Sequence, residues 1–557
     1  MKRAALTVLL FVVPFTAFAA SAPTQAVIVM MKQTGRLTVK SLAANLDPSV
    51  SDGERDVRDL PGIHGFAANL TADEIASLKA SGKVISIDPD LERHALTDSV
   101  SVGQQTTPYG LTAIDAPPVW PVTRGKSLSN GPAIHVAIID TGIDYNYSEL
   151  AAAFKTGFNY INRTADPLDD NGHGTHVAGT IAAANDGAGV VGIASDVDIY
   201  SLKVLDTCGS GRTSDIIQAL QWVVDKKKEI GGNWIINLSL GSDTPSTPEQ
   251  TAFDAASNAG ILIFAAAGNS YDGTDGLSYP AGYPSVVSVG AVDSNNLIAS
   301  FSQRGADLKL VAPGVNVIST FLNGRVATDD GRKIPANFAD GTLSSGDSAC
   351  LSRGPVTAKF VSGGTGNVTE IPASVSGKIA LIERGGTDPS GTGLTFLAKT
   401  RNALAKGAIG VVVYSNANPV VTPGFSALTQ TDVNTLPPMA LIERADGLAL
   451  LATPNVTLTM SFDSHGLTEL FALLNGTSMA TPHAVGAAAL VWAASPNSTS
   501  TNVATALEQT AKDLGTAGQD TTYGYGLVDA LAAAKQLNPA AFVPAPVKGR
   551  QPGRRGH

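Results

Sequence analysis

The sequence predicts an α/β protein with a mainly parallel sheet, to which further domains are attached. Short apolar runs alternate with helical stretches over residues 104–325, as in a parallel sheet covered by helices on both faces. The chain has 557 residues, of which 43% are apolar and 15% charged, a composition typical of globular domains and a length beyond one hydrophobic core. The expected strands are 135–139, 234–238, 261–267 and 286–292.

Polar residues follow three of these expected strands. Asp140 follows the first, Ser239 follows the second, and Asn269 comes soon after the third. Ligands of open parallel sheets bind beyond the carboxyl ends of the strands. We therefore expect these three residues to lie at one edge of the sheet, beside the functional site.

The N-terminus has the pattern of a cleaved export signal. Lys2 and Arg3 precede an apolar run over residues 4–18, and small residues surround the expected cleavage point. This run is too short to predict a membrane span, and no other uninterrupted apolar stretch of spanning length occurs. We expect a signal peptide at 1–20 and a secreted mature protein that has no membrane contact after its removal.

Charge and cysteine content narrow the class of partner. The formal net charge is -10, and basic residues cluster only near the C-terminus, which argues against nucleic acid as a partner. Solubility alone is the simpler explanation of the negative net charge. The two cysteines, Cys208 and Cys350, lack metal-site spacing. One disulfide and two separate thiols are both compatible with the sequence.

Three motifs carry candidate chemistry, although each has an ordinary structural explanation. His173 stands between Gly172 and Gly174, which would let other chain segments approach the imidazole closely. Ser478 stands where a loop enters a helix of small residues expected over 479–493, and alone it reads as a helix N-cap. Asp140 alone reads as a turn acid.

Taken together, the three motifs resemble those of the subtilisin-like serine proteases, the subtilase or peptidase S8 family. The matching segments are 137–142, 173–179 and 476–483, and the resemblance covers 104–323 and 468–530. One departure is Ala484-Val485, where the family has Val-Ala; both orders keep the helix small. The resemblance implies a three-layer subtilisin-like fold and a monomeric serine endopeptidase. It would hydrolyse polypeptide substrates through an acyl-enzyme and be made as a self-processed zymogen.

The resemblance also assigns roles to single residues. Ser478 would be the nucleophile, His173 its general base, and Asp140 the acid that orients the histidine. Asn269 would stabilise the oxyanion together with the Ser478 N–H. Residues that do not align with the triad are expected to be structural; they are Asp144, His135, His176 and His483.

Substrate-binding segments follow from the same resemblance. Ser239, Leu240 and Gly241 would pair with the substrate as a β-strand. The opposite wall of the first specificity pocket would be Ala266, Ala267 and Gly268, with Ser270 and Ser278 near its floor. We expect no charge to face this pocket, which favours an apolar or broad preference over a basic one.

A calcium site is also implied by the resemblance, and its oxygen donors suit that ion. The side-chain ligands would be Gln105, Glu149 and Asp186, with the carbonyls of Ala184, Ala188 and Val190. A surface loop with scattered acids is the alternative. A second, weaker site of the family is not expected, because Lys309 stands where a carboxylate is needed.

Two further parts of the chain resemble domains that accompany the catalytic domain in this family. Residues 26–98 resemble an I9-type inhibitory propeptide, a small α+β domain, through 65–70 and 87–90. Thr71 and Glu74 predict a capping box there, and cleavage is expected between Thr97 and Gln105. Such a propeptide assists folding and then occupies the cleft until it is cleaved.

Residues 326–465 resemble an inserted, β-rich protease-associated (PA) domain, through 377–385, 405–414 and 436–439. It would position substrate, restrict access to the cleft or act as a passive spacer, and a Cys208–Cys350 disulfide would tether it. The catalytic domain is then 104–325 and 466–538, and 539–557 is expected to be a flexible basic tail.

Two other functions fit the sequence less well. An esterase would need the Gly-x-Ser-x-Gly elbow, which Ser478 lacks. A non-catalytic binding protein would have no need of an intact triad and Asn269.

Overall fold

The computed structural model describes part of the chain, in two compact units, Met1–Asp90 and Leu91–His557. The described residues are 24–32, 57–90, 92–93, 106–322, 324–343, 348–349, 351, 354–416, 424–462 and 470–543. The predicted signal peptide and propeptide cleavage region lie outside them. Within these ranges, no helix combines the length and the hydropathy needed to cross a membrane.

The first unit is a small antiparallel sheet with one helix. Its strand order is β2-β3-β1-β4. The strands are β1 (Thr24–Met31), β2 (Arg58–Leu60), β3 (Gly65–Thr71) and β4 (Val84–Pro89). Helix α3 (Ala72–Ala80) begins with the expected capping box: the Glu74 N–H donates to Thr71 Oγ1, and the Thr71 N–H donates to the Glu74 carboxylate.

The second unit is built on a seven-stranded sheet whose pairings are all parallel. The strand order is β13-β12-β11-β10-β6-β8-β7. The strands are β6 (Ile134–Asp140), β7 (Phe154–Asn159), β8 (Asp198–Lys203), β10 (Asn233–Leu238), β11 (Leu262–Ala266), β12 (Val287–Val292) and β13 (Leu310–Pro313). The central strands are buried throughout, which explains why they are apolar runs rather than alternating patterns.

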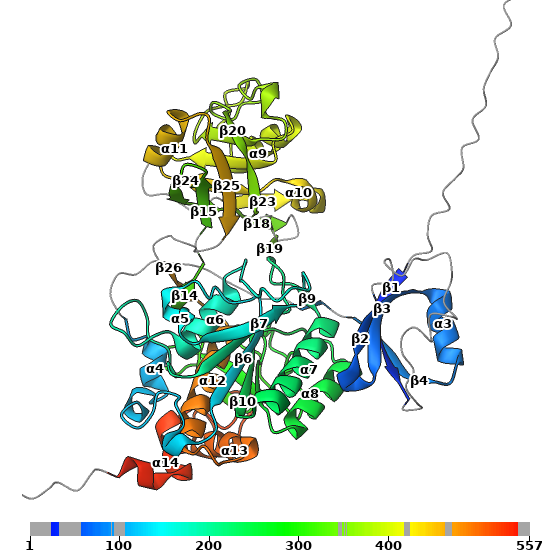
Figure 1. Ribbon diagram of the computed structural model, residues 1–557, viewed down its shortest axis with the longest axis vertical. Helices are drawn as coiled ribbons and strands as arrows, with labels where there is room; N and C mark the ends of the chain where they lie inside the picture. The colour runs from blue at the N-terminus through cyan, green and yellow to red at the C-terminus, as the bar shows by residue number, and fades with distance from the viewer. Residues whose placement is uncertain are drawn as a thin grey trace, which may run out of the picture. The chain divides into compact units, whose positions relative to one another are not determined.

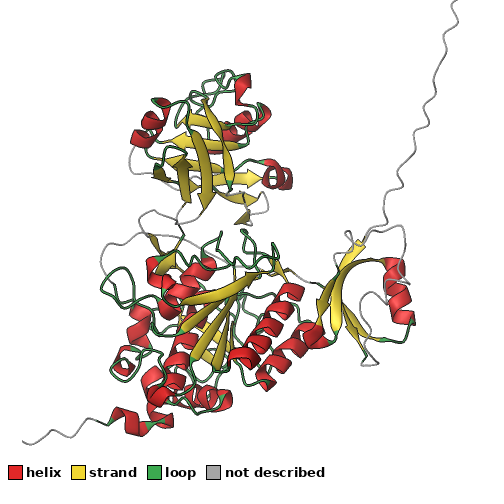
Figure 2. Cartoon of the chain, viewed as in Figure 1, coloured by secondary structure: helices red, strands yellow, loops and turns green. Residues whose placement is uncertain are grey.

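Helices lie on both sides of this sheet (Figure 2). They include α6 (His173–Ala182), α7 (Thr213–Ile230), α8 (Thr247–Asn258), α12 (Thr477–Ala494), α13 (Ser500–Thr510) and α14 (Ala530–Leu537). Every residue of α12 is buried, and this helix contacts strands β10 to β13 as well as helices α6 and α14. Its small side chains permit that central position, which brings Ser478 to the carboxyl ends of the strands.

The inserted region leaves and re-enters the core through one antiparallel pair, β14 (Val317–Phe321) and β26 (Leu470–Leu474). Between them an eight-stranded mixed sheet has the order β16-β15-β25-β20-β21-β22-β24-β17 (Figure 1). Its strands are β15 (Gly324–Thr328), β16 (Lys333–Pro335), β17 (Asn337–Phe338), β20 (Val356–Ser362), β21 (Ile379–Glu383), β22 (Gly410–Tyr414), β24 (Met439–Ile442) and β25 (Thr457–Phe462).

The described part of the insert also contains three α-helices, a short 3-10 helix (Ala373–Val375) and a small second sheet. The helices are α9 (Phe396–Ala405), α10 (Gln430–Thr435) and α11 (Arg444–Leu451). The second sheet joins β18 (Asp340–Leu343) to β19 (Ser348–Ala349) and β23 (Gly424–Leu428). The first insert strand, β15, begins two residues before the predicted boundary at 326.

The C-terminal boundary differs from the prediction. Residues Pro539–Phe542 form a short 3-10 helix, and Phe542 packs against the main hydrophobic core. The ordered domain therefore extends beyond 538, because an aromatic side chain anchors the start of the predicted tail. Residues 544–557 lie outside the described residues.

Candidate active site

Asp140 and His173 form a buried pair at the carboxyl edge of the parallel sheet. Strand β6 ends on Asp140, and α6 begins at His173. Asp140 Oδ1 lies 2.7 Å from His173 Nδ1 and also accepts a hydrogen bond of 2.7 Å from the Thr141 N–H. Both side chains are fully buried. The histidine tautomer that donates from Nδ1 is therefore favoured.

The glycines beside His173 make this approach sterically feasible. A Cβ at Gly174 would overlap the Gly142 carbonyl, and the Gly174 N–H donates to Thr141 Oγ1 at 2.9 Å. Gly172 has φ +106°, and a Cβ there would lie 2.7 Å from the Phe321 ring. Both glycines are thus required by close packing around the pair, as the sequence predicts.

The environment of His173 raises its pKa above the ordinary value of 6.5. Burial acts to lower this pKa, but the charge and hydrogen bond of Asp140 raise it and prevail, and the charge of Asp169 adds to them. The other ring nitrogen, Nε2, makes no hydrogen bond with any described residue. His173 therefore has one nitrogen fixed by a carboxylate and one available for proton transfer.

Ser478 is held at the end of β10 by reciprocal hydrogen bonds with Ser239. Ser478 Oγ donates to the Ser239 carbonyl at 3.0 Å, and Ser239 Oγ donates to the Ser478 carbonyl at 2.8 Å. Asn237 Nδ2 in turn donates to Ser239 Oγ at 3.0 Å. The Ser478 hydroxyl thus points to a carbonyl rather than to His173 Nε2. The hydrogen bond between a nucleophile and its base is often absent from unliganded sites and forms when substrate binds.

Asn269 and the Ser478 N–H face one small space. Asn269 Oδ1 accepts from both the N–H and the hydroxyl of Thr477, each at 2.8 Å, so the amide nitrogen Nδ2 is turned the other way. A Cβ on Gly476 would lie 3.3 Å from Asn269 Nδ2 and 3.6 Å from the Ser478 nitrogen. As the second residue of α12, Ser478 has no intrahelical acceptor for its N–H. Two donors therefore converge where Gly476 leaves room.

The rival acid and histidines have other partners. Asp144 accepts from the Asn146 N–H at 3.0 Å. His135 Nδ1 lies 3.3 Å from the Asp198 carboxylate. Burial lowers the pKa of His176 to about 3 and that of His483 to about 4, so both are neutral at physiological pH. His176 Nε2 lies within hydrogen-bond distance of the Val317 and Ala472 carbonyls, and His483 Nδ1 of the Met479 carbonyl. These contacts agree with structural roles.

The predicted substrate-binding segments flank the same edge. Ser239, Leu240 and Gly241 follow β10, whereas Ala266 ends β11 and is followed by Ala267 and Gly268. The Ser278 N–H donates to the Ala267 carbonyl at 2.8 Å, and a Cβ on Gly241 would lie 3.3 Å from Ser278 Cβ. Ser278 thus links the two segments.

A carboxylate lies beside one predicted pocket residue, although no charge is expected to face the pocket. Ser278 Oγ lies 2.9 Å from Asp243 Oδ1, and Asp243 is exposed. The side chain of Asp243 folds back beside Ser278, 35 residues away in the sequence. The linear pattern gave no sign of this approach.

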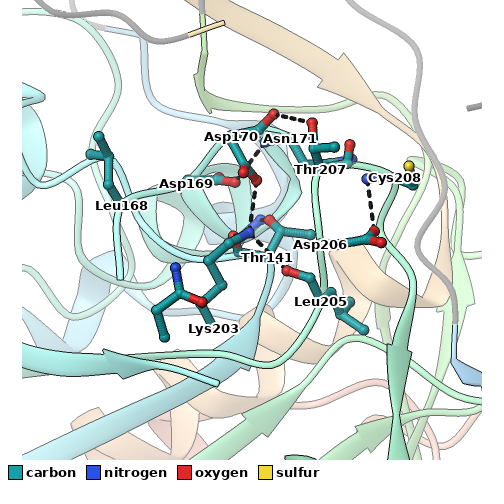
Figure 3. Close-up of polar contacts among 12 residues, drawn as sticks. Thr141, Leu168, Asp169, Asp170, Asn171, Lys203, Leu205, Asp206, Thr207 and Cys208 are labelled. Carbon is teal, nitrogen blue, oxygen red and sulfur yellow. Dashed lines mark hydrogen bonds and ion pairs between the residues drawn. The ribbon is translucent and has the colours of Figure 1, made fainter. Parts of the chain in front are cut away.

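The loop that follows β8 makes polar contacts with the segment 168–171 (Figure 3). Lys203 is buried, and its Nζ donates to Asp170 Oδ1 and to the carbonyls of Thr141 and Leu205 at 2.7–2.8 Å. Thr207 Oγ1 donates to the Asp170 carbonyl at 3.0 Å. Cys208, in the same loop, is disulfide-bonded. The only other cysteine of the sequence, Cys350, lies outside the described residues.

This loop leads into β9 (Gly211–Arg212), which the sequence analysis did not predict. Strand β9 pairs antiparallel with β5 (Glu92–Arg93), a segment that follows the first unit in the chain. Gly211 also bridges to Leu205, whose N–H donates to the Asp140 carbonyl at 3.2 Å. An extended chain segment is therefore paired with a strand next to the Asp140 end of the sheet.

The predicted calcium ligands are only partly brought together. Glu149, on α5 (Ser148–Ala151), is buried, and a Cβ on Gly189 would overlap its carboxylate. The Glu149 carbonyl accepts from the Ala184 N–H at 3.0 Å, so the 184–190 loop lies against this residue. Asp186 instead accepts from the Ala188 N–H at 3.0 Å. Gln105 lies outside the described residues. In the described ranges, this region included, no three His, Cys, Asp or Glu side chains form a metal-binding group.

Comparisons with known proteins place the chain in a family. The model of the subtilase family, Peptidase S8, matches residues 131–355 and 363–526, and that of peptidase inhibitor I9 matches 28–96. Subtilisin E of Bacillus subtilis (strain 168) is 37% identical over 307 residues, 55% of this chain and 75% of that protein. M-protease of Shouchella clausii (strain KSM-K16) is 36% identical over 299 residues, 53% and 73% respectively.

A solved structure is also similar. It is the psychrophilic subtilisin-like protease Apa1 from the Antarctic psychrotroph Pseudoalteromonas sp. AS-11, at 32% identity and a TM-score of 0.48, covering 79% of this chain and 100% of that one. The family model by itself spans more than half of the chain. The chain therefore belongs to the subtilase family, as a subtilisin-like serine protease with an N-terminal I9 inhibitor domain.

Proposed function

We propose that Asp140, His173 and Ser478 form the catalytic triad of this endopeptidase. The observation that carries this assignment is the buried 2.7 Å contact between Asp140 and His173, which leaves Nε2 without a partner among the described residues. His173 Nε2 takes the proton of Ser478 Oγ as that oxygen attacks the peptide carbonyl. The imidazolium then gives the proton to the leaving amine, and water releases the acyl group by the same steps in reverse.

Asn269 Nδ2 and the Ser478 N–H are the proposed oxyanion donors. Their support is the fixed amide orientation, because Thr477 occupies Asn269 Oδ1 from two sides. Donors fixed before the reaction stabilise the developing negative charge without reorganisation in the transition state. Ser239 to Gly241 and Ala266 to Gly268 would bind the substrate on either side.

The triad is tested with Ser478→Ala whose propeptide has been removed by an added protease of another catalytic class, which is then inhibited and separated, and it is compared with the mature parent. Casein hydrolysis should fall about a millionfold, while the circular dichroism spectrum stays that of the parent. Ser257→Ala, on α8, is the matched control and should retain full activity. A serine-reactive inhibitor should label the parent but not the Ser478 variant. Full activity of Ser478→Ala would overturn the assignment.

We further propose that the chain is exported and matures by its own activity. Support comes from the signal-like residues 1–20, the I9 domain and the pairing of β5 with β9. The Ser478→Ala chain should then accumulate unprocessed, whereas the parent should appear in the medium as a monomer. N-terminal sequencing should place its start between 97 and 105. Processing of purified Ser478→Ala alone would contradict self-cleavage.

Calcium is proposed to hold the 184–190 loop to Glu149. The fit rests on a buried carboxylate set against that loop and on an all-oxygen donor set. When bound, the ion would supply charge neutralisation to Glu149 and cross-link the loop to α5. Chelation should lower the melting temperature of the parent but have little effect on Glu149→Gln. Equal shifts in both proteins would contradict this site.

We propose that the insert is a PA-type domain tethered by a Cys208–Cys350 disulfide. The disulfide-bonded state of Cys208 and the presence of one other cysteine support this pairing. A tryptic digest under non-reducing conditions should contain the linked peptides, and thiol titration of the unfolded protein should find no free thiol. A linked dimer through Cys208 would contradict the tether.

A further inference from the structure

Three oxygen-bearing side chains meet at Ser278, a buried residue that the sequence analysis placed near the floor of the first specificity pocket. Ser278 Oγ lies 2.9 Å from Asp243 Oδ1 and 2.7 Å from Gln303 Oε1. The Gln303 amide is oriented by its other end, because Nε2 lies 3.2 Å from the Gly276 carbonyl and donates to it. Oε1 is therefore the atom that faces Ser278.

This cluster has fewer protons than acceptors. Asp243 as a carboxylate and Gln303 Oε1 only accept hydrogen bonds, and the Ser278 hydroxyl has one proton for two acceptors. One of the two short oxygen–oxygen contacts therefore lacks a proton. A donor entering from outside would satisfy it, and an ammonium or guanidinium group brings several N–H donors together with a compensating charge.

The cluster lies against the segment that follows β11 and carries Asn269. A Cβ on Gly268 would overlap both Gln303 Oε1 and Ser278 Oγ, so these atoms touch the backbone one residue before Asn269. On the other side, Gly241 packs against Ser278, and Ser242 pairs with Tyr279 through two backbone hydrogen bonds. The three oxygens thus lie between the two proposed substrate-binding segments.

No neighbouring cation of the described chain neutralises Asp243. Asp243 forms no ion pair with another described residue. Among these residues, the hydrogen bond from Ser278 is the side-chain hydrogen bond that its carboxylate accepts. Arg304, next to Gln303, lies over the Tyr271 ring with its Cζ 4.2 Å from the ring centroid. Asp243 is exposed, so its charge is accessible from solvent.

We propose that Asp243 gives this protease a preference for substrates whose residue before the scissile bond is lysine or arginine. The proposal rests on the proposed function, since it assumes that Ser478 is the nucleophile and that the two segments bind the substrate. Lysine and arginine combine a long apolar stem, which suits the alanine-rich wall, with the donors that Asp243 and Gln303 lack. Ser278 would hold the carboxylate toward them.

The test uses the processed enzyme and a series of Ala-Ala-Pro-Xaa p-nitroanilides, with Xaa as Lys, Arg, Gln, Leu, Phe or Glu. The Lys/Gln ratio of kcat/KM should exceed one for the parent and fall about tenfold in Asp243→Asn, with Glu the poorest substrate of the parent. Because the carboxylate is exposed, the ratio should also decrease as salt is raised. Asp225→Asn, an exposed carboxylate on α7, should keep the parent ratio.

Two results would overturn the proposal: a parent enzyme that prefers Leu or Phe with a Lys/Gln ratio of one or less, or an unchanged ratio in Asp243→Asn. The parent series and its salt dependence decide the matter even if the variant does not fold. Failure of the proposed function would look different, because Ser478→Ala would then hydrolyse the whole series.

Discussion

The catalytic core and the insert both combine parallel strands with helices, and both bury titratable side chains. They differ in the hydrogen-bond partners that these side chains have. In the insert, Lys399 is 1% exposed and donates to the carbonyls of Thr365, Glu383 and Gly385. In the core, His173 is also fully buried, but its Nε2 has no described partner.

The difference teaches that burial of charge does not by itself mark an active site. Burial lowers the pKa of Lys399 to about 8, which alone would suggest reactivity, but all three of its protons have carbonyl acceptors. The core instead leaves His173 Nε2, Asn269 Nδ2 and the Ser478 N–H available. A ring nitrogen without a described partner is not sufficient by itself, because His176 Nδ1 and His483 Nε2 also lack one; His173 differs in its contact with the Asp140 carboxylate.

After Ser478→Ala, the largest effect should come from Asp140→Asn, which breaks the pair that leaves Nε2 available. The amide favours the wrong histidine tautomer, so kcat should fall about 10⁴-fold. Because Asp140 raises the pKa of His173, the parent rate should rise with pH through a midpoint above 6.5, where the neutral base forms. In Asp140→Asn this limb should move to lower pH. Profiles of kcat/KM from pH 5 to 10 measure both the loss of rate and the midpoint of its rise with pH. If the midpoint were the same in Asp140→Asn and the parent, His173 would not be the base.

A smaller loss is expected for Asn269→Ala, which removes one of the two converging donors. The value of kcat should fall by about 10²–10³ with little change in KM, because the lost hydrogen bond forms mainly in the transition state. Asn295→Ala, in an exposed turn, is the control. Steady-state kinetics on one peptide substrate suffice. Loss through KM alone would mean that Asn269 binds substrate rather than the oxyanion.

The smallest effect on chemistry should come from Lys399→Met in the insert. It leaves three carbonyls without a donor, so unfolding of the insert should become easier by about 3 kcal/mol. The kcat/KM for a short peptide should stay that of the parent. Denaturant unfolding measures the stability of the insert, and the peptide assay measures catalysis. Lys406→Met is the control for both measurements. A large loss of peptide hydrolysis would show that the insert takes part in catalysis.

The parts of the site that follow from local sequence could be predicted, and those that depend on long-range packing could not. Strand β6 ends on Asp140 and α12 begins beside Ser478, because buried apolar runs and glycine-bounded helix starts are encoded locally. The Asp243–Ser278 contact and the pairing of β9 with β5 join segments that are distant in the chain. No local pattern specifies such contacts, and only the packed structure reveals them.

The fold shows the same division. The four expected core strands occur within one or two residues, since each is buried along its length. The tail boundary was wrong because Phe542 finds a place on the core that its proline-rich surroundings do not suggest. Here the packing of one aromatic side chain, Phe542, sets the boundary of the domain.

The β14–β26 pair has a consequence for how this protein can be altered. Phe321 pairs with Leu470, so the chain leaves and returns at adjacent positions of one hairpin. A short turn could close that hairpin without breaking a hydrogen bond of the catalytic sheet. The junction is therefore a natural graft point, where a foreign binding module could be spliced in and display a new targeting surface while the hydrolytic machinery stays untouched.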